Sequence, residues 1–286
     1  MNFRTDLALE RRELIYDNVP DGVKFEEKIE GKTKITRIKI ETKEGEEALN
    51  KPRGNYITLE IPPLSANPTE SETEIELIAA EISALISQKG CVLVAGLGNH
   101  NITPDAIGPK TVEYTLSTRH VAESMPQFNF RPVAAVAPGV MGQTGIETGE
   151  VIRGICDRIK ADCVIAVDAL ASRSVSRLGC TVQISDTGIS PGSGVGNARR
   201  ELSQSTLGVP VIAIGVPTVV DALTVAQDAV KSGGEAFIDK SKLGSLMVTP
   251  REIDSVVTSV SKVLALSIGR ALQKDLSVSD LYFLTQ

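Results

Sequence analysis

The chain has 286 residues, of which 42% are hydrophobic, so it can bury a large core as one big domain or as two small ones. Its formal net charge is −6, which excludes the broad basic surface that direct nucleic-acid binding requires. It contains no run of roughly 18 apolar residues, and its N-terminus is too charged for a signal peptide, so neither a membrane span nor export by that route is expected.

The N-terminal part of the chain is predicted to be rich in strands. KTKITRIKIE (32–41) and NYITLEI (55–61) alternate apolar and polar side chains, which is typical of antiparallel or edge strands. Residues 7–65 are therefore expected to form a β-rich elaboration. Ser71–Glu74 then matches a capping box, which predicts the start of a helix. The apolar face of this helix would be Ile75, Leu77, Ile78, Ile82, Leu85 and Ile86.

Five short apolar runs follow, separated by helical or polar segments. They are CVLVAGLG (91–98), VAAVAPG (133–139), CVIAVDAL (163–170), CTVQISDTG (180–188) and VPVIAIGVP (209–217). Such runs are typical of strands buried on both faces of a sheet. A second capping box at Thr249–Glu252 predicts a long last helix. Residues 7–286 are therefore expected to form one α/β domain, with three α/β/α layers and a mostly parallel sheet.

Carboxylates follow several of these runs. Open parallel sheets bind ligands beyond the carboxyl ends of their strands, and Asp105, Asp168, Asp186 and Asp221 are all expected there. Each could instead cap a helix or close an Asx-turn, an alternative that applies most to Asp221. It applies least to Asp168, whose sequence neighbours are apolar. We expect four carboxylates around one crevice.

Two neighbouring carboxyl groups can share one proton, activate water and protonate a leaving group. The sequence lacks H-E-x-x-H, G-x-S-x-G and a phosphate loop, so an acid pair is the favoured chemistry. Asn99 and His100 lie in the turn before Asp105, and His100 could contact substrate or a metal. Gly192 and Gly194 lie in a loop that either is a simple turn or presents backbone N–H groups to the substrate.

The four cysteines are Cys91, Cys156, Cys163 and Cys180. They have no C-x-x-C spacing, and three of them lie in or beside apolar runs, where cysteine usually packs as a small hydrophobic residue. A reducing cytoplasmic interior is the expected compartment.

Five blocks together cover nearly the whole chain: RTDLALE, GLGNHNITPDAIGP, PGVMGQTGIET, VIAVDALASRS and ISDTGISPGSGVGN. In this order they resemble the germination protease of spore-forming bacteria, an atypical aspartic endopeptidase that degrades small acid-soluble spore proteins. The resemblance implies a fold related to hydrogenase-maturation endopeptidases, a homotetramer in the forespore or spore core, and a catalytic pair at Asp105 and Asp168.

The resemblance also implies a zymogen that processes itself. The family's substrates are cut in a pattern similar to E-[apolar]-A-x-E, and Asp6–Glu10 reads D-L-A-L-E. Residues 1–6 are therefore expected to be a propeptide released by a cut between Asp6 and Leu7 upon mild acidification. The alternative is that this polar N-terminus is only a disordered tail or the cap of a first helix.

The maturation relatives use a histidine in a metal cluster, for which this sequence offers no clear equivalent. We therefore expect metal-independent hydrolysis without a cofactor. Two alternatives remain open: a metal-dependent processing endopeptidase of the hydrogenase-maturation type, and a non-catalytic ligand sensor.

Overall fold

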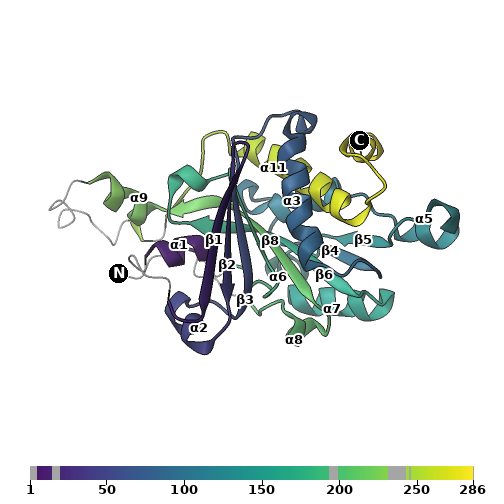
Figure 1. Ribbon diagram of the computed structural model, residues 1–286, viewed down its shortest axis with the longest axis horizontal. Helices are drawn as coiled ribbons and strands as arrows, with labels where there is room; N and C mark the ends of the chain where they lie inside the picture. Colours follow the sequence, from purple (N-terminus) through teal and green to yellow (C-terminus); the bar gives the residue numbers. More distant parts are fainter. Residues whose placement is uncertain (1–4, 15–19, 193–198, 231–242, 245, 286) are drawn as a thin grey trace.

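The computed structural model describes residues 5–14, 20–192, 199–230, 243–244 and 246–285. In these residues nine strands form one sheet with helices packed on it (Figure 1). The strands are β1 (Val23–Glu30), β2 (Thr33–Ile40), β3 (Gly54–Glu60), β4 (Val92–Gly96), β5 (Val133–Val136), β6 (Cys163–Ser172), β7 (Thr181–Ser185), β8 (Val211–Asp221) and β9 (Met247–Val248).

The sheet is mixed, so the expectation of a mostly parallel sheet is wrong. The strand order is β1-β2-β3-β7-β8-β6-β4-β5, and β9 pairs with β8. β5, β4, β6 and β8 run parallel, whereas β7, β3, β2, β1 and β9 pair antiparallel with their neighbours. Only residues 173–180 join β6 to β7. A parallel crossover needs roughly a dozen residues or more, so β7 returns in the opposite direction.

The N-terminal strands extend this sheet. β2 and β3 agree with the predicted strands, whereas β1 was not predicted. Its sequence VKFEEKIE is mostly charged, and most of its side chains are at least partly exposed. Charged residues are common on edge strands, where they discourage pairing with another chain. The missing apolar alternation therefore reflects the position of β1 at the edge of the sheet.

The helices connect and cover the strands. The α-helices are α1 (Ala8–Glu13), α2 (Lys43–Leu49), α3 (Glu72–Leu85), α4 (Ile107–Glu113), α5 (Arg119–Ser124), α6 (Met141–Thr144), α7 (Thr148–Ile159), α8 (Gln204–Leu207), α9 (Ala222–Ala229), α11 (Ile253–Leu272) and α12 (Val278–Leu284). Short 3-10 helices are η1 (Pro68–Ser71), η2 (Thr103–Asp105), η3 (Pro126–Phe128) and η4 (Val175–Arg177).

Both faces of the central strands are buried. Val92 and Val94 of β4 belong to an apolar cluster with α3 and α11, whereas Leu93 and Ala95 pack in a second cluster with α7 and α8. Successive side chains of a strand point to opposite faces, so one apolar run supplies both clusters. In Figure 1, α3 and α11 lie on one side of the sheet and α7 and α8 on the other. This arrangement explains the near-continuous apolar runs.

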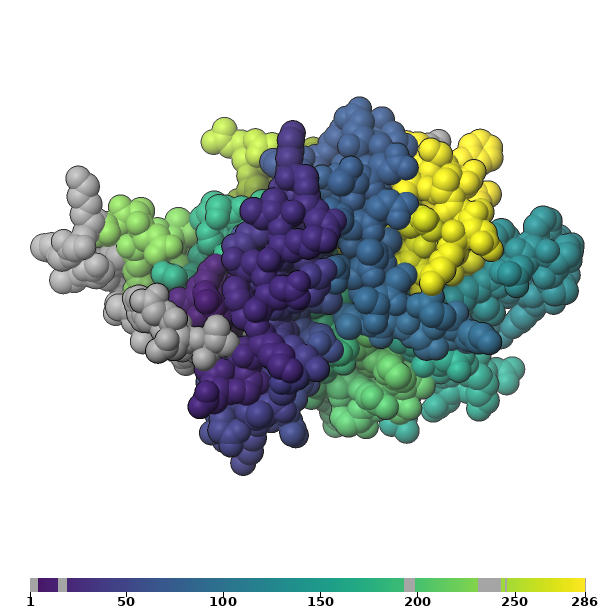
Figure 2. Space-filling model, viewed as in Figure 1, coloured from purple at the N-terminus to yellow at the C-terminus, as the bar shows by residue number. Residues whose placement is uncertain are grey.

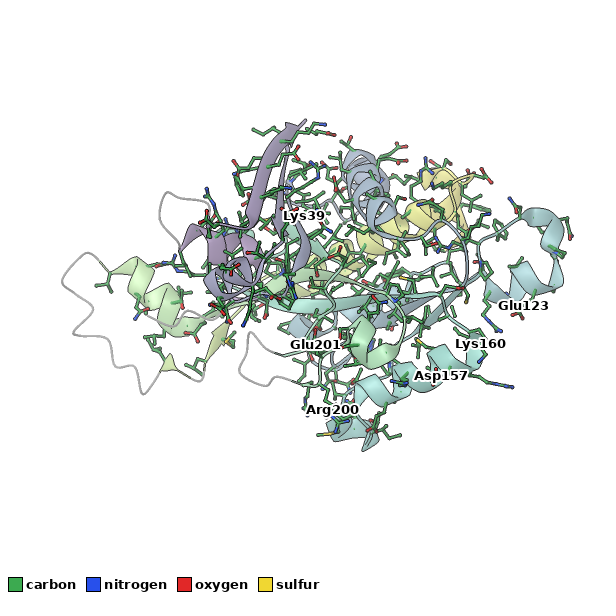
Figure 3. All side chains as sticks on the ribbon, turned by 60° about the horizontal axis from the view of Figure 1, so that its bottom comes forward. Lys39, Glu123, Asp157, Lys160, Arg200 and Glu201 are labelled. Carbon is green, nitrogen blue, oxygen red and sulfur yellow. The ribbon has the colours of Figure 1, made fainter. Side chains whose placement is uncertain are left out.

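The long helix α11 is a core helix. It is long and apolar enough to cross a membrane, but most of it is buried inside the fold. Its neighbour α3 lies beside the N-terminal strands on one face of the molecule (Figure 2). By contrast, charged side chains such as Glu123, Asp157 and Lys160 are exposed (Figure 3).

Neither predicted capping box forms. Ser71 precedes α3 but its side chain accepts no capping hydrogen bond, because η1 comes first and is capped by Asn67. Thr249 instead donates its hydroxyl to the carbonyl oxygen of Thr218 at 2.8 Å, and α11 begins at Ile253. The Thr249 hydroxyl is therefore engaged in a tertiary hydrogen bond and does not cap the helix.

Candidate active site

Asp105 and Asp168 line one cavity of about 380 Å³, which we call the Asp105 cavity. Asp105 ends the short helix η2 that follows β4, and Asp168 lies within β6. β4 ends at Gly96, which pairs with Val167, so Asp168 emerges where its neighbouring strand stops. The fold therefore brings both predicted carboxylates to one cavity.

The turn after β4 is shaped by close packing. Gly98 has a φ of +107°, and a Cβ atom there would lie 2.1 Å from the backbone oxygen of Asp105. Only glycine allows this approach without strain. The adjacent Asn99 donates its backbone N–H to Asp105 Oδ2 at 2.7 Å, while its side chain accepts from Gln143 at 3.1 Å. The G-x-G sequence thus positions Asp105.

Asp168 is the more deeply buried carboxyl group, with 4% of its surface exposed. Burial raises its pKa well above the ordinary value, the charge of Asp105 raises it further, and a backbone hydrogen bond from Ala169 opposes the shift. Burial also raises the pKa of the half-buried Asp105, against a hydrogen bond from Asn99. In such a coupled pair the more buried group retains its proton to higher pH. We expect Asp168 to carry that proton.

Two other predicted carboxylates have structural partners. Asp186 is exposed, lines neither of the cavities described in this section, and accepts hydrogen bonds from the backbone and side-chain nitrogens of Asn55 at 2.7 and 2.5 Å. Its strand β7 runs antiparallel, and although Ser185 and Thr187 on either side of it line one of these cavities, Asp186 does not. Asp221 caps α9 by accepting from Leu223 and Thr224, as the alternative reading predicted. The expected group of four carboxylates around one crevice is therefore wrong.

Three other predicted site residues are His100, Gly192 and Gly194. The His100 side chain is 56% exposed, and its Nδ1 lies 3.4 Å from Glu113 Oε1. Gly192 lines the Asp105 cavity, whereas Gly194 lies outside the described residues. Among the residues the structure describes, no group of three or more His, Cys, Asp or Glu is placed to hold a metal ion.

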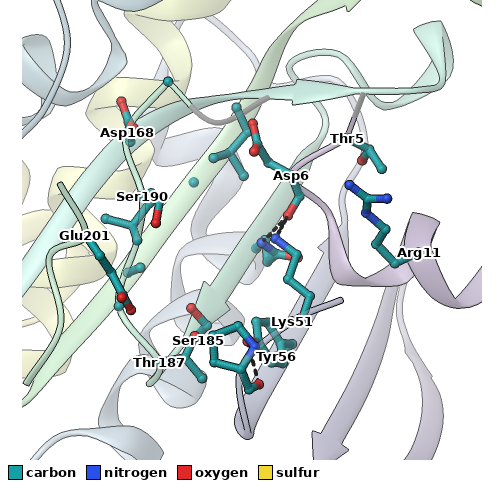
Figure 4. Close-up of a pocket in the computed structure, with 18 of the residues that line it drawn as sticks. Thr5, Asp6, Arg11, Lys51, Tyr56, Asp168, Ser185, Thr187, Ser190 and Glu201 are labelled. Carbon is teal, nitrogen blue, oxygen red and sulfur yellow. Dashed lines mark hydrogen bonds between the residues drawn. The ribbon is translucent and has the colours of Figure 1, made fainter. Parts of the chain in front are cut away.

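A second cavity of about 620 Å³, which we call the Lys51 cavity, adjoins the first. Asp6 and Asp168 line both cavities. The close-up in Figure 4 includes Asp6, Lys51 and Asp168 among the residues that line the Lys51 cavity. The N-terminal segment therefore forms part of the wall of the cavities that Asp168 lines.

The segment around the predicted processing site is firmly held. Asp6 exchanges hydrogen bonds with Ala171 of β6: its N–H donates to the Ala171 oxygen at 3.0 Å, and its Oδ2 accepts from the Ala171 nitrogen at 2.9 Å. Leu7 and Ala8 are completely buried. Glu10 accepts from Ser172 and from the backbone nitrogen of Arg173, both at 2.7 Å. The segment is thus packed along β6.

Sequence reasoning missed Lys51 and Gln183. Lys51 lies between α2 and β3 and gave no motif. Gln183 is only 8% exposed within β7, and a long polar side chain inside the apolar run CTVQIS was a signal that could have found it. Both side chains hydrogen bond to Asp6.

Comparisons with known proteins agree on one family. The sequence profile described as germination protease matches residues 5–233. Germination proteases of Clostridium perfringens strain 13 and Clostridium tetani are 45% and 43% identical to the chain, over 98% of the chain and of each relative. That of Bacillus pumilus is 49% identical over 79% of this chain and 66% of its own length.

A solved structure is also similar in part. A hydrogenase maturation protease from Thermococcus kodakarensis aligns with 66% of this chain and 98% of its own, at 17% identity. The TM-score of 0.36 is too low to equate the two folds.

Proposed function

The chain belongs to the germination protease family, and from that premise we propose that Asp105 and Asp168 are the catalytic pair of a spore-germination endopeptidase. The observation that carries this proposal is that both carboxyl groups line one cavity and both have a raised pKa. Perturbed carboxyl groups in a cavity are typical of acid–base sites. Small acid-soluble spore proteins are the proposed substrates.

The proposed reaction needs one proton shared by the pair. Ionised Asp105 accepts a proton from water as the water oxygen attacks the scissile carbonyl carbon. Protonated Asp168 donates its proton to the leaving nitrogen as the C–N bond breaks. The products are a carboxylic acid and an amine, and the proton taken by Asp105 restores the singly protonated pair. The difference in burial between the two aspartates supports this division of roles.

We propose that the enzyme is made as a zymogen and cuts itself between Asp6 and Leu7. The position of Asp6 in the wall of both cavities that Asp168 lines supports this. Residues 1–4 of the proposed propeptide lie outside the described residues. The homotetramer and the spore-core location remain predictions.

Incubation with a small acid-soluble spore protein tests the proposed function. At mildly acidic pH, which favours the singly protonated pair, we expect the chain to process itself and then cut the spore protein at acid–apolar–Ala–x–acid sequences. Mass spectrometry of the fragments locates the cuts. An intact spore protein would contradict the substrate assignment, and complete loss of cleavage in EDTA would favour the metal-dependent alternative.

Processing is expected to be intramolecular. Leu7 and Ala8, immediately after the proposed cut, are completely buried, so the active site of a second molecule cannot reach them without displacing the segment. The first-order rate constant for the appearance of a Leu7 N-terminus should therefore stay constant over about a hundredfold dilution. A rate constant that rises in proportion to protein concentration would show that one molecule cuts another.

A further inference from the structure

We propose that Lys51 and Gln183 form the site that stabilises the oxyanion when the Asp6–Leu7 bond is cut. The Lys51 ammonium donates to the carbonyl oxygen of Asp6 at 2.8 Å, and Gln183 Nε2 donates to the same oxygen at 3.3 Å. Figure 4 shows the Lys51 side chain extended to Asp6. The inference rests on the proposed function, because this oxygen belongs to the bond that self-processing would break.

Gln183 holds the chain on both sides of that bond. While its Nε2 donates to the Asp6 oxygen, its Oε1 accepts from the Ala8 nitrogen at 2.7 Å. One rigid amide therefore spans the proposed scissile bond, from the carbonyl before it to the second N–H after it. Because Gln183 is buried within β7, its position is set by the sheet rather than by the segment.

Hydrogen bonds to β6 also orient the carbonyl group of Asp6. The two hydrogen bonds with Ala171 hold the backbone nitrogen and the carboxylate of Asp6 against β6. Its carbonyl is left to accept from Lys51 and Gln183 on the side of the Lys51 cavity. Asp168 lines this same cavity, and the charge of Asp6 contributes to its raised pKa. The carbonyl and the proposed acid thus border the same cavity.

Both donors suit the charge that develops during the reaction. As water adds to the carbonyl carbon, the Asp6 oxygen gains a full negative charge, which the ammonium and the amide N–H stabilise more strongly than the neutral carbonyl. When the C–N bond breaks, the oxygen returns to a carbonyl within the new Asp6 carboxyl group, and Leu7 leaves as an amine. Burial lowers the pKa of Lys51, against the nearby charge of Asp6, so acidification favours the cationic form that this role requires.

The test compares Lys51→Met and Gln183→Met in the full chain with Lys24→Met, an exposed lysine of β1 paired with Glu41. We expect Lys51→Met to slow processing about 10²-fold or more, as loss of one oxyanion donor does in other enzymes. Gln183→Met should slow it about tenfold, because a neutral donor at 3.3 Å contributes less. Lys24→Met should process at the wild-type rate.

Hydrogen exchange of the Ala8 amide separates this role from simple anchoring. In Lys51→Met the amide keeps its Gln183 partner, so its protection should not change although processing slows. Protection that falls in the same proportion as the rate would show that Lys51 only anchors the segment, and would overturn the proposal.

Two further outcomes are distinguishable. If the wild type cuts itself and both Lys51→Met and Gln183→Met do so at the same rate, the oxyanion role fails while the catalytic pair stands. If the wild type produces no Leu7 N-terminus at mildly acidic pH, proposed self-processing fails and the role of Lys51 fails with it.

Discussion

Asp105→Asn and Asp168→Asn are each expected to reduce cleavage of a small acid-soluble spore protein, and self-processing, by at least about 10³-fold. An amide at either position can neither take a proton from water nor donate one to the leaving nitrogen. Initial rates by mass spectrometry measure the loss. Asp157→Asn is the matched control, because Asp157 is exposed on α7 and should leave the rate unchanged. Near-normal turnover by either cavity variant would refute the catalytic pair.

The inactive Asp168→Asn protein is expected to be at least as stable as the wild type near neutral pH. The pKa of Asp168 is raised in the folded chain. Between the unfolded value of about 3.9 and that raised value, the folded state binds a proton that the unfolded state has lost. Stability therefore falls as pH rises through this window, by up to about 1.4 kcal/mol per pH unit. The amide of the Asp168→Asn variant stays neutral at every pH and avoids this loss.

Urea unfolding over a pH series measures this difference. The Asp168→Asn variant should show a weaker decline of unfolding free energy with rising pH than the wild type. If it were instead strongly destabilised at neutral pH, its inactivity would no longer identify a catalytic role.

Glu10→Ala is expected to lower the free energy of unfolding by about 2–3 kcal/mol, because it removes a buried carboxylate that accepts several hydrogen bonds. The Glu10 side chain is 2% exposed and lies 3.0 Å from the Arg177 guanidinium. It also accepts from Ser172 and from the backbone nitrogens of Arg173 and Ser174. Without it, these donors lose a shared acceptor, although Ser174 still donates to Ser172 Oγ and Arg177 still pairs with Glu13 and Glu60. Urea unfolding at neutral pH measures the change.

Glu13→Ala is the matched control for this variant. Glu13 also lies on α1 and pairs with Arg177 at 2.6 Å, but its side chain is 43% exposed. An exposed ion pair contributes about 1 kcal/mol or less. Equal destabilisation by the two variants would contradict the view that Glu10 anchors the N-terminal segment after the proposed cut.

Periodic and local features of the sequence predicted much of the fold. The runs that became β4, β6, β7 and β8 were recognisable because burial on both faces of a sheet demands continuous apolar residues. The position of Asp105 just after β4 could be predicted for the same reason, whereas Asp168 lies within β6, which continues to Ser172. β1 could not, since an edge strand exposes most of its side chains and carries no such pattern.

The sequence by itself thus determined the family, through five ordered blocks, and the buried strands, through continuous apolar runs, and the two carboxylates of the Asp105 cavity could be found from their places in or after those runs. Only the tertiary structure decided the pairing of β3 with β7, which places Asn55 against the Asp186 carboxylate. It alone also placed Asp6 against Lys51 and Gln183, 45 and 177 residues away. Such contacts depend on which strands become neighbours, and pairing between distant segments leaves no periodic signal in either one.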